Sequence, residues 1–75
     1  MKYITLEFQK NAEGVIATIS LAHDSEQAAL AQFFTVMHAA TSSNLLVHGC
    51  SIMNEYGAPM RYEYISNEQQ PEAGE

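Results

Sequence analysis

The residues best suited to chemistry in this 75-residue chain are His48 and Cys50, which lie two positions apart. In an extended strand that spacing points both side chains to one face, and imidazole and thiolate are ligands that zinc favours. His38 would have to supply a third ligand. Zinc sites usually carry paired Cys-x-x-Cys or His-x-x-x-His units, and the sequence contains neither. We therefore expect packing roles for His48 and Cys50, with no metal and no other cofactor.

Catalysis is not favoured by the remaining reactive groups. A cysteine nucleophile needs an exposed thiolate and a base within hydrogen-bond reach, whereas neighbours on one strand face are spaced more widely than that. The carboxylates fall on outward strand positions, in turns and at the start of a helix, and no two converge in a predicted cleft. We expect that the protein is not an enzyme.

The charge balance restricts the partners. Nine acidic residues against three basic ones give a net charge of −6. Binding to nucleic acid or to an anionic membrane requires clustered Lys and Arg, so neither is expected. The single cysteine excludes an internal disulfide and is typical of a reducing compartment, and no apolar run reaches the roughly 20 residues of a membrane span. We expect a cytoplasmic protein.

Two hairpins are predicted from alternating apolar residues. Residues 2–10 and 15–21 flank Asn11-Ala12-Glu13-Gly14, and a four-residue turn would pair Lys10 with Val15 and place Ile4, Leu6 and Phe8 on the core face. Residues 45–54 and 58–65 flank a turn at Asn54–Gly57 that suits a type I turn with a glycine bulge. The core face of this second hairpin is predicted to hold Leu46, His48, Cys50, Ile52, Met60, Tyr62 and Tyr64, because Arg61 and Glu63 would be costly inside.

A helix is predicted between the hairpins, from roughly Asp24 to Ser43. Asp24 and Gln27 have the spacing of a capping box, and neither glycine nor proline interrupts the segment that follows. At 100° per residue one wide apolar arc gathers Ala29, Leu30, Phe33, Phe34, Val36, Met37, Ala40 and Thr41.

The element order is therefore ββαββ. It predicts a two-layer α+β sandwich in which an antiparallel four-stranded sheet of order 2-1-3-4 carries the helix on one face, with order 1-2-4-3 as the alternative. We expect one domain over residues 1–65 and a disordered acidic tail over residues 66–75, which are polar and contain a proline.

Two surfaces lack the charge expected of solvent-exposed positions. The outward arc of the helix carries no charge beyond Glu26, and the outer face of the second hairpin combines several apolar residues. Depletion of charge is typical of an interface core, although alanine-rich helices also favour small uncharged residues for their helix propensity. The partner-binding residues predicted from these two surfaces are Gln27, Ala31, Gln32, Thr35, His38, Leu45, Val47, Met53 and Ile65.

The opening Met1-Lys2-Tyr3, which leads into a hairpin and then a helix, resembles the HicB-type antitoxins in element order. Their proline- and glycine-containing strand before the helix has no counterpart in residues 21–24, and no residue motif matches. The resemblance therefore assigns no residue role. In size and style the chain is also similar to the short acidic ββαββ proteins that occur among phage-encoded inhibitors of bacterial enzymes and defence systems.

From these observations we expect a small non-enzymatic protein–protein interaction module, an inhibitor or regulator of bacterial or phage origin. It would bind another protein or itself, as a homodimer. Two alternatives stay open. One is a small-ligand or metal-binding module around His48, Cys50, Tyr62 and Tyr64, and the other is an acidic mimic that inhibits a nucleic-acid-binding enzyme.

Overall fold

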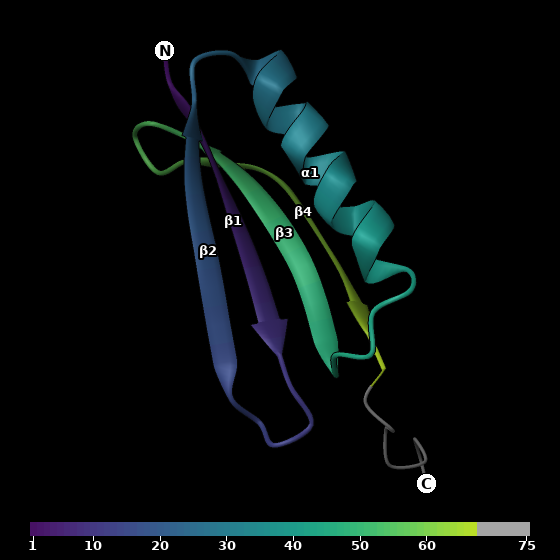
Figure 1. The fold of residues 1–75 in the computed structure, drawn as a ribbon. Helices are drawn as coiled ribbons and strands as arrows, with labels where there is room; N and C mark the ends of the chain where they lie inside the picture. The colour runs from purple at the N-terminus through teal and green to yellow at the C-terminus, as the bar shows by residue number, and fades with distance from the viewer. Residues whose placement is uncertain (68–75) are drawn as a thin grey trace, which may run out of the picture.

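The computed structural model describes residues 1–67, which form one sheet and one helix (Figure 1). The elements are β1 (Tyr3–Lys10), β2 (Ile16–His23), α1 (Glu26–Ala40), β3 (Val47–Asn54) and β4 (Pro59–Ser66). All three strand pairs are antiparallel and the sheet order is β2-β1-β3-β4. The predicted ββαββ sandwich and its strand order are confirmed, and α1 covers a single face of the sheet.

Helix α1 is shorter at both ends than the sequence suggested. Its N-cap is Ser25, whose side chain accepts a hydrogen bond from the Ala28 amide at 3.1 Å, and its C-cap is Thr41. The predicted cap, Asp24, instead pairs with Lys2 at the surface. The helix begins one residue later than predicted because the Ser25 hydroxyl reaches the free amides of the first turn.

The inner side of α1 is narrower than the predicted arc. The fully buried members are Ala29, Phe33, Val36 and Ala40, and Leu30 and Met37 pack partly against them. Phe34 and Thr41 were predicted to face the sheet, but both are exposed. A 15-residue helix on a small twisted sheet covers only a stripe of it, so side chains at the margins of the arc stay in solvent.

The two hairpin turns have the same structure. In residues 11–15 the Asn11 side chain accepts hydrogen bonds from the Glu13 and Val15 amides, and in residues 54–58 Asn54 does the same for Tyr56 and Ala58. Each turn ends in a glycine with positive φ, 86° at Gly14 and 85° at Gly57. An L side chain rarely adopts that conformation, which explains a glycine at each position.

The first turn therefore has one more residue than predicted, and this reverses the faces of β1. Lys10 pairs with Ile16 rather than Val15, and Thr5 rather than Leu6 faces the helix. The prediction that Ile4, Leu6 and Phe8 lie in the core under α1 is wrong. They lie on the opposite face of the sheet, because a slip of one residue moves every side chain of a strand to the other side.

A bulge in the second hairpin has a similar effect. Met53 pairs with Pro59, but Ile52 pairs with Arg61, so Met60 is the extra residue. Beyond the bulge Arg61, Glu63 and Ile65 share the helix-covered face with His48, Cys50 and Ile52, whereas Tyr62 and Tyr64 lie on the other face. The predicted core positions of Tyr62 and Tyr64 are wrong for this reason.

Strand β4 extends one residue beyond the predicted domain end. Ser66 closes β4, and Asn67 donates from its backbone amide to the Leu46 carbonyl at 2.7 Å. Residues 68–75 of the predicted tail lie outside the described residues. The helix in the described part of the chain is too short and not apolar enough to cross a membrane.

Candidate interaction surfaces

The face of the sheet turned away from α1, here called the open face, carries most of the large apolar side chains of the strands. Cross-strand partners project to the same side, so the registers define its members. They are Ile4, Leu6, Phe8 and Lys10 of β1; Ile16, Thr18, Ser20 and Ala22 of β2; Val47, Gly49, Ser51 and Met53 of β3; and Pro59, Tyr62, Tyr64 and Ser66 of β4.

An aromatic cluster forms the centre of the open face. The Phe8 ring stacks on Tyr62 with centroids 5.8 Å apart, and Tyr62 contacts Tyr64 at 5.6 Å. Gly49 lies beneath them, and a Cβ there would come within 2.6 Å of both the Phe8 ring and the Tyr64 Cβ. A side chain at position 49 would displace the Phe8 ring and push against β4, where the Glu63 carbonyl oxygen would be 2.7 Å away. The cluster is nevertheless open to solvent, since Tyr62 and Tyr64 are 55% and 54% exposed.

No acidic residue lies on the open face within the described strands. The strand carboxylates, Glu7 and Glu63, are on the helix-covered face, and the other acids of the described residues are in the two turns and around the helix start. Lys10 at one end is the only charged member of the open face. A chain of net charge −6 therefore presents a face that is neutral apart from one cation.

The helix-covered face is the more polar one. His48 is buried and its Nε2 donates to the Glu7 carboxylate at 2.7 Å, which also accepts from the Gln9 amide at 3.0 Å. The other ring nitrogen, Nδ1, is buried without a hydrogen-bond partner in the described residues. Thr5 is also buried and contacts the His23 ring at 3.0 Å. These polar contacts lie beside the apolar core that α1 forms with Cys50 and Ile52.

Cys50 is placed as a packing residue. It is fully buried in the core cluster with Phe33 and Ile52, and burial, helped by the nearby Glu7 carboxylate, raises the pKa of its thiol to about 11. A thiol in that environment is protonated at neutral pH and is a poor nucleophile and a poor metal ligand. His48 contacts Glu7 and His38 lies on the exposed side of α1. Among residues 1–67 no three His, Cys, Asp or Glu side chains are grouped to hold a metal ion.

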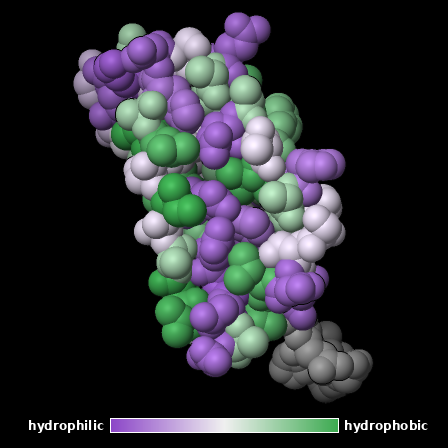
Figure 2. Space-filling view, in the orientation of Figure 1, coloured by the Kyte–Doolittle hydropathy of each residue, from purple (hydrophilic) through white to green (hydrophobic). Residues whose placement is uncertain are grey.

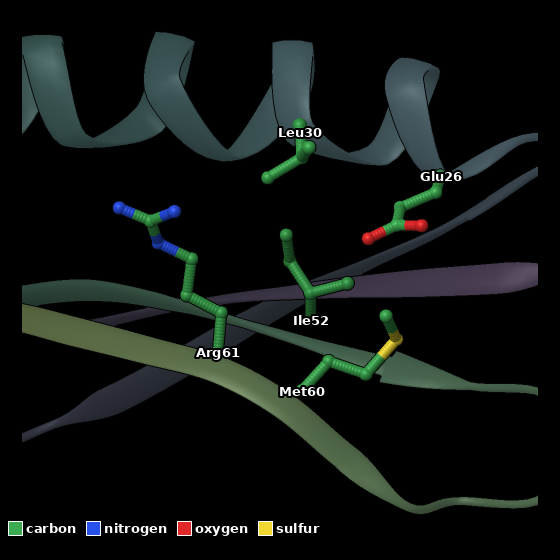
Figure 3. A pocket seen from close by; sticks show the side chains of 5 residues that line it. All are labelled: Glu26, Leu30, Ile52, Met60 and Arg61. Atoms are coloured by element: carbon green, nitrogen blue, oxygen red, sulfur yellow. The ribbon is translucent and has the colours of Figure 1, made fainter.

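A small pocket opens between the start of α1 and β4 (Figure 3). Its volume is about 180 Å³, and it is lined by Glu26, Leu30, Ile52, Met60 and Arg61. Cavities that hold drug-sized ligands measure roughly 300–1,000 Å³, so this one is small. The Arg61 guanidinium turns away from it and lies 5.1 and 4.9 Å from the centroids of Phe33 and Phe34. Arg61 is tolerated on the helix-covered face because of this contact, its ion pair with Glu63 at 3.3 Å and a side chain that stays 43% exposed.

The predicted partner-binding residues fall on three surfaces and one loop. Gln27, Ala31, Thr35 and His38 are exposed on α1 and Gln32 is half-buried there. Val47 and Met53 lie on the open face, and Leu45 is in the loop that precedes β3. Ile65 pairs with His48 and so lies on the helix-covered face, away from Val47 and Met53. The predicted patch of four apolar residues is therefore divided, and its place on the open face is taken by the aromatic cluster.

The residues missed by sequence reasoning are Phe8, Tyr62 and Tyr64 with Gly49 beneath them. One signal was available, because Asn11–Val15 and Asn54–Ala58 share the pattern Asn-x-x-Gly-x. Applying the same turn to both hairpins gives the observed register of β1 and β2. The bulge at Met60 has no comparable sequence signal.

No known protein family, curated protein or solved structure matches this chain. What the surfaces do must therefore be argued from their own chemistry.

Proposed function

We propose that this chain is a non-enzymatic protein-interaction module whose working surface is the open face, and that a second copy of the chain covers that face. One observation carries the proposal. Ile4, Leu6 and Phe8 face away from the helix while Thr5 and Glu7 face it. Strands normally put their apolar side toward the layer that covers them, so this arrangement favours a second covering layer on the open face.

The size of the open face suits a small dimer. Four strands of eight residues span a surface of about 26 by 19 Å, or about 500 Å² in projection. Two such faces in contact bury about 1,000 Å² if they are treated as flat. Protruding side chains increase the accessible area that is buried, toward the roughly 1,200 Å² at which stable interfaces begin. Sheets packed face to face in this way form a core about 10 Å thick.

The distribution of charge favours a second copy as the occupant. Two chains that each carry −6 repel one another unless their contact avoids the acidic residues. The open face does so, because the two carboxylates of the described strands, Glu7 and Glu63, both lie on the helix-covered face. An aromatic cluster surrounded by uncharged residues also has the composition of an interface core, which a second copy would bury.

The test places one negative charge on the open face. Tyr62→Glu would bring like charges into the contact, and Tyr56→Glu makes the same change at an exposed turn residue. We expect light scattering to give the mass of an oligomer for the unmodified chain and for Tyr56→Glu, and half that mass for Tyr62→Glu. Circular dichroism verifies that the variants are folded. A folded Tyr62→Glu variant with unchanged mass, or an unmodified chain that is monomeric at micromolar concentration, contradicts the proposal.

A further inference from the structure

The two edges of the sheet differ in how they are protected. β4 carries Pro59, the bulge at Met60 and the charged pair Arg61 and Glu63, all features that discourage another strand from pairing with an edge. β2 has none of them. Its sequence, IATISLAH, contains no proline and no Asp, Glu, Lys or Arg, and its eight residues pair one for one with β1 without a bulge.

The backbone of β2 has free pairing groups along its outer side. The Asn11 amide donates to the Val15 carbonyl at 3.0 Å, so Asn11 and Val15 are a hydrogen-bonded pair. This pair determines which residues of β2 bond to β1 and which do not. Hydrogen-bonded pairs recur at every second residue, so Ala17, Ile19 and Leu21 bond to β1. The amide and carbonyl groups of Ile16, Thr18, Ser20 and Ala22 therefore point outward, to the edge. This edge is regular over seven residues.

The side chains at the edge add an apolar stripe. Ile19 and Leu21 lie on the helix-covered side of the sheet, yet they are 47% and 42% exposed because α1 runs over β1 and β3 rather than over β2. In Figure 2 hydrophobic side chains gather along the side where β2 lies, and hydrophilic ones fill the band between them and the helix. A strand added beside β2 would cover the part of this stripe that the helix leaves open.

We infer that β2 pairs antiparallel with β2 of a second copy, about a twofold axis at Ile19. This register uses every outward group of the strand: Thr18 bonds to Ser20 of the other copy, and Ile16 bonds to Ala22. It places Ile19 beside its own counterpart and sets the large Leu21 against the small Ala17. The two sheets then become one of eight strands, with both helices on the same side.

Self-complementarity is the reason to assign a second copy rather than an extended peptide of another protein. A twofold axis at Ile19 matches large with small side chains and hydroxyl with hydroxyl, and it brings no charged side chain within the paired residues. The contact is isologous, so one surface satisfies both copies. It leaves the open face uncovered, and it is independent of the proposed function.

A cross-linking experiment tests the register. At a non-hydrogen-bonded pair the two Cα atoms lie about 4.5 Å apart, which is within the range of roughly 4.4–6.8 Å for a disulfide. Ile19→Cys should therefore link two copies under mild oxidation and double the mass on a non-reducing gel. Leu21→Cys is the matched control, because four residues of offset separate the two thiols by about 14 Å. The native Cys50 is buried and its raised pKa keeps it unreactive.

Each result of this experiment decides the inference. Efficient linkage of Ile19→Cys with little linkage of Leu21→Cys supports it. Equal linkage of both variants, linkage of Leu21→Cys alone or linkage of neither contradicts it. If an extended peptide of another protein occupies the edge, Ile19→Cys copies stay unlinked.

Mass measurements separate this contact from the open-face contact. Ile19→Lys places two lysines at the twofold axis and breaks only the β2 contact, whereas Tyr62→Glu breaks only the open-face contact. If both contacts form, the unmodified chain is a tetramer, each variant is a dimer and the double variant is a monomer. If Ile19→Lys leaves the mass unchanged while Tyr62→Glu halves it, the β2 pairing is wrong and the open-face proposal stands. If Tyr62→Glu leaves the mass unchanged while Ile19→Lys halves it, the open-face proposal is wrong and the β2 pairing stands.

Discussion

The contact between Glu7 and His48 leads to a prediction whose size can be worked out from the structure. The two side chains are 16% and 7% exposed, and the Glu7 carboxylate accepts from both His48 Nε2 and Gln9. Glu7→Ala leaves Nε2 buried without a partner, as Nδ1 already is. An orphaned buried donor costs about 1–3 kcal/mol. Adding the lost hydrogen bond to a carboxylate, we expect Glu7→Ala to lower the free energy of unfolding by about 2–3 kcal/mol.

Glu63 provides a matched control on the same row of the sheet. Glu7 and Glu63 flank Cys50 from the two neighbouring strands, but the Glu63 side chain is 51% exposed and its partner Arg61 is 3.3 Å away. An exposed ion pair of this kind is worth at most about 1 kcal/mol. Glu63→Ala should therefore have a small effect. Glu7→Gln keeps an acceptor for His48 and should recover part of the loss.

Urea unfolding followed by circular dichroism measures these differences. With a slope of about 1 kcal/mol per molar urea for a chain of this size, Glu7→Ala should lower the midpoint by about 2–3 M. All variants need the same protomer concentration, because a self-associating chain gains stability with concentration. If Glu7→Ala costs no more than Glu63→Ala, the polar contact does not hold the inner layer of the sheet, and our account of that face is wrong.

Two further predictions concern Gly49 and Cys50. Gly49→Ala should destabilise the fold by about 1–3 kcal/mol in thermal unfolding, since its Cβ would overlap Phe8 and Tyr64, and Ser51→Ala on the same face should be close to neutral. The Cys50 thiol has its pKa raised from 9.0 to about 11, so the folded state holds a proton that the unfolded state releases in that range. Stability should be complete below pH 9 and fall by roughly 2–3 kcal/mol as the pH rises to 11. The Cys50→Ala variant should lose less stability over this pH range. An equal loss would contradict the assignment of the loss to the Cys50 thiol.

The sequence and the structure agree wherever the controlling information is local. The helix between residues 26 and 40 follows from an uninterrupted apolar period, and its start differs from the prediction only in whether Asp24 or Ser25 supplies the cap. The hairpins follow from alternating residues around an asparagine–glycine turn. Connection rules narrowed their order in the sheet to two candidates, and the structure has the preferred one, β2-β1-β3-β4.

One extra residue in each hairpin determined which side of the strands faces the helix. The predicted register buried Ile4, Leu6 and Phe8 under α1, because the most apolar side of the strand was expected to form the core. The first turn has one residue more than that register needs, and the second hairpin gains one at Met60. Because strand side chains alternate with a period of two, each extra residue exchanges the faces.

From the sequence alone one can determine an acidic α+β domain with two hairpins, one helix and a reactive-looking pair, His48 and Cys50. Only the tertiary structure shows that this pair is enclosed, with Glu7 beside the imidazole and core side chains around the thiol. Only the tertiary structure brings Phe8, Tyr62 and Tyr64 together on an uncovered face. Alternation along a strand shows that it has two faces, but which one is covered depends on register and on the path of the helix, which are non-local properties.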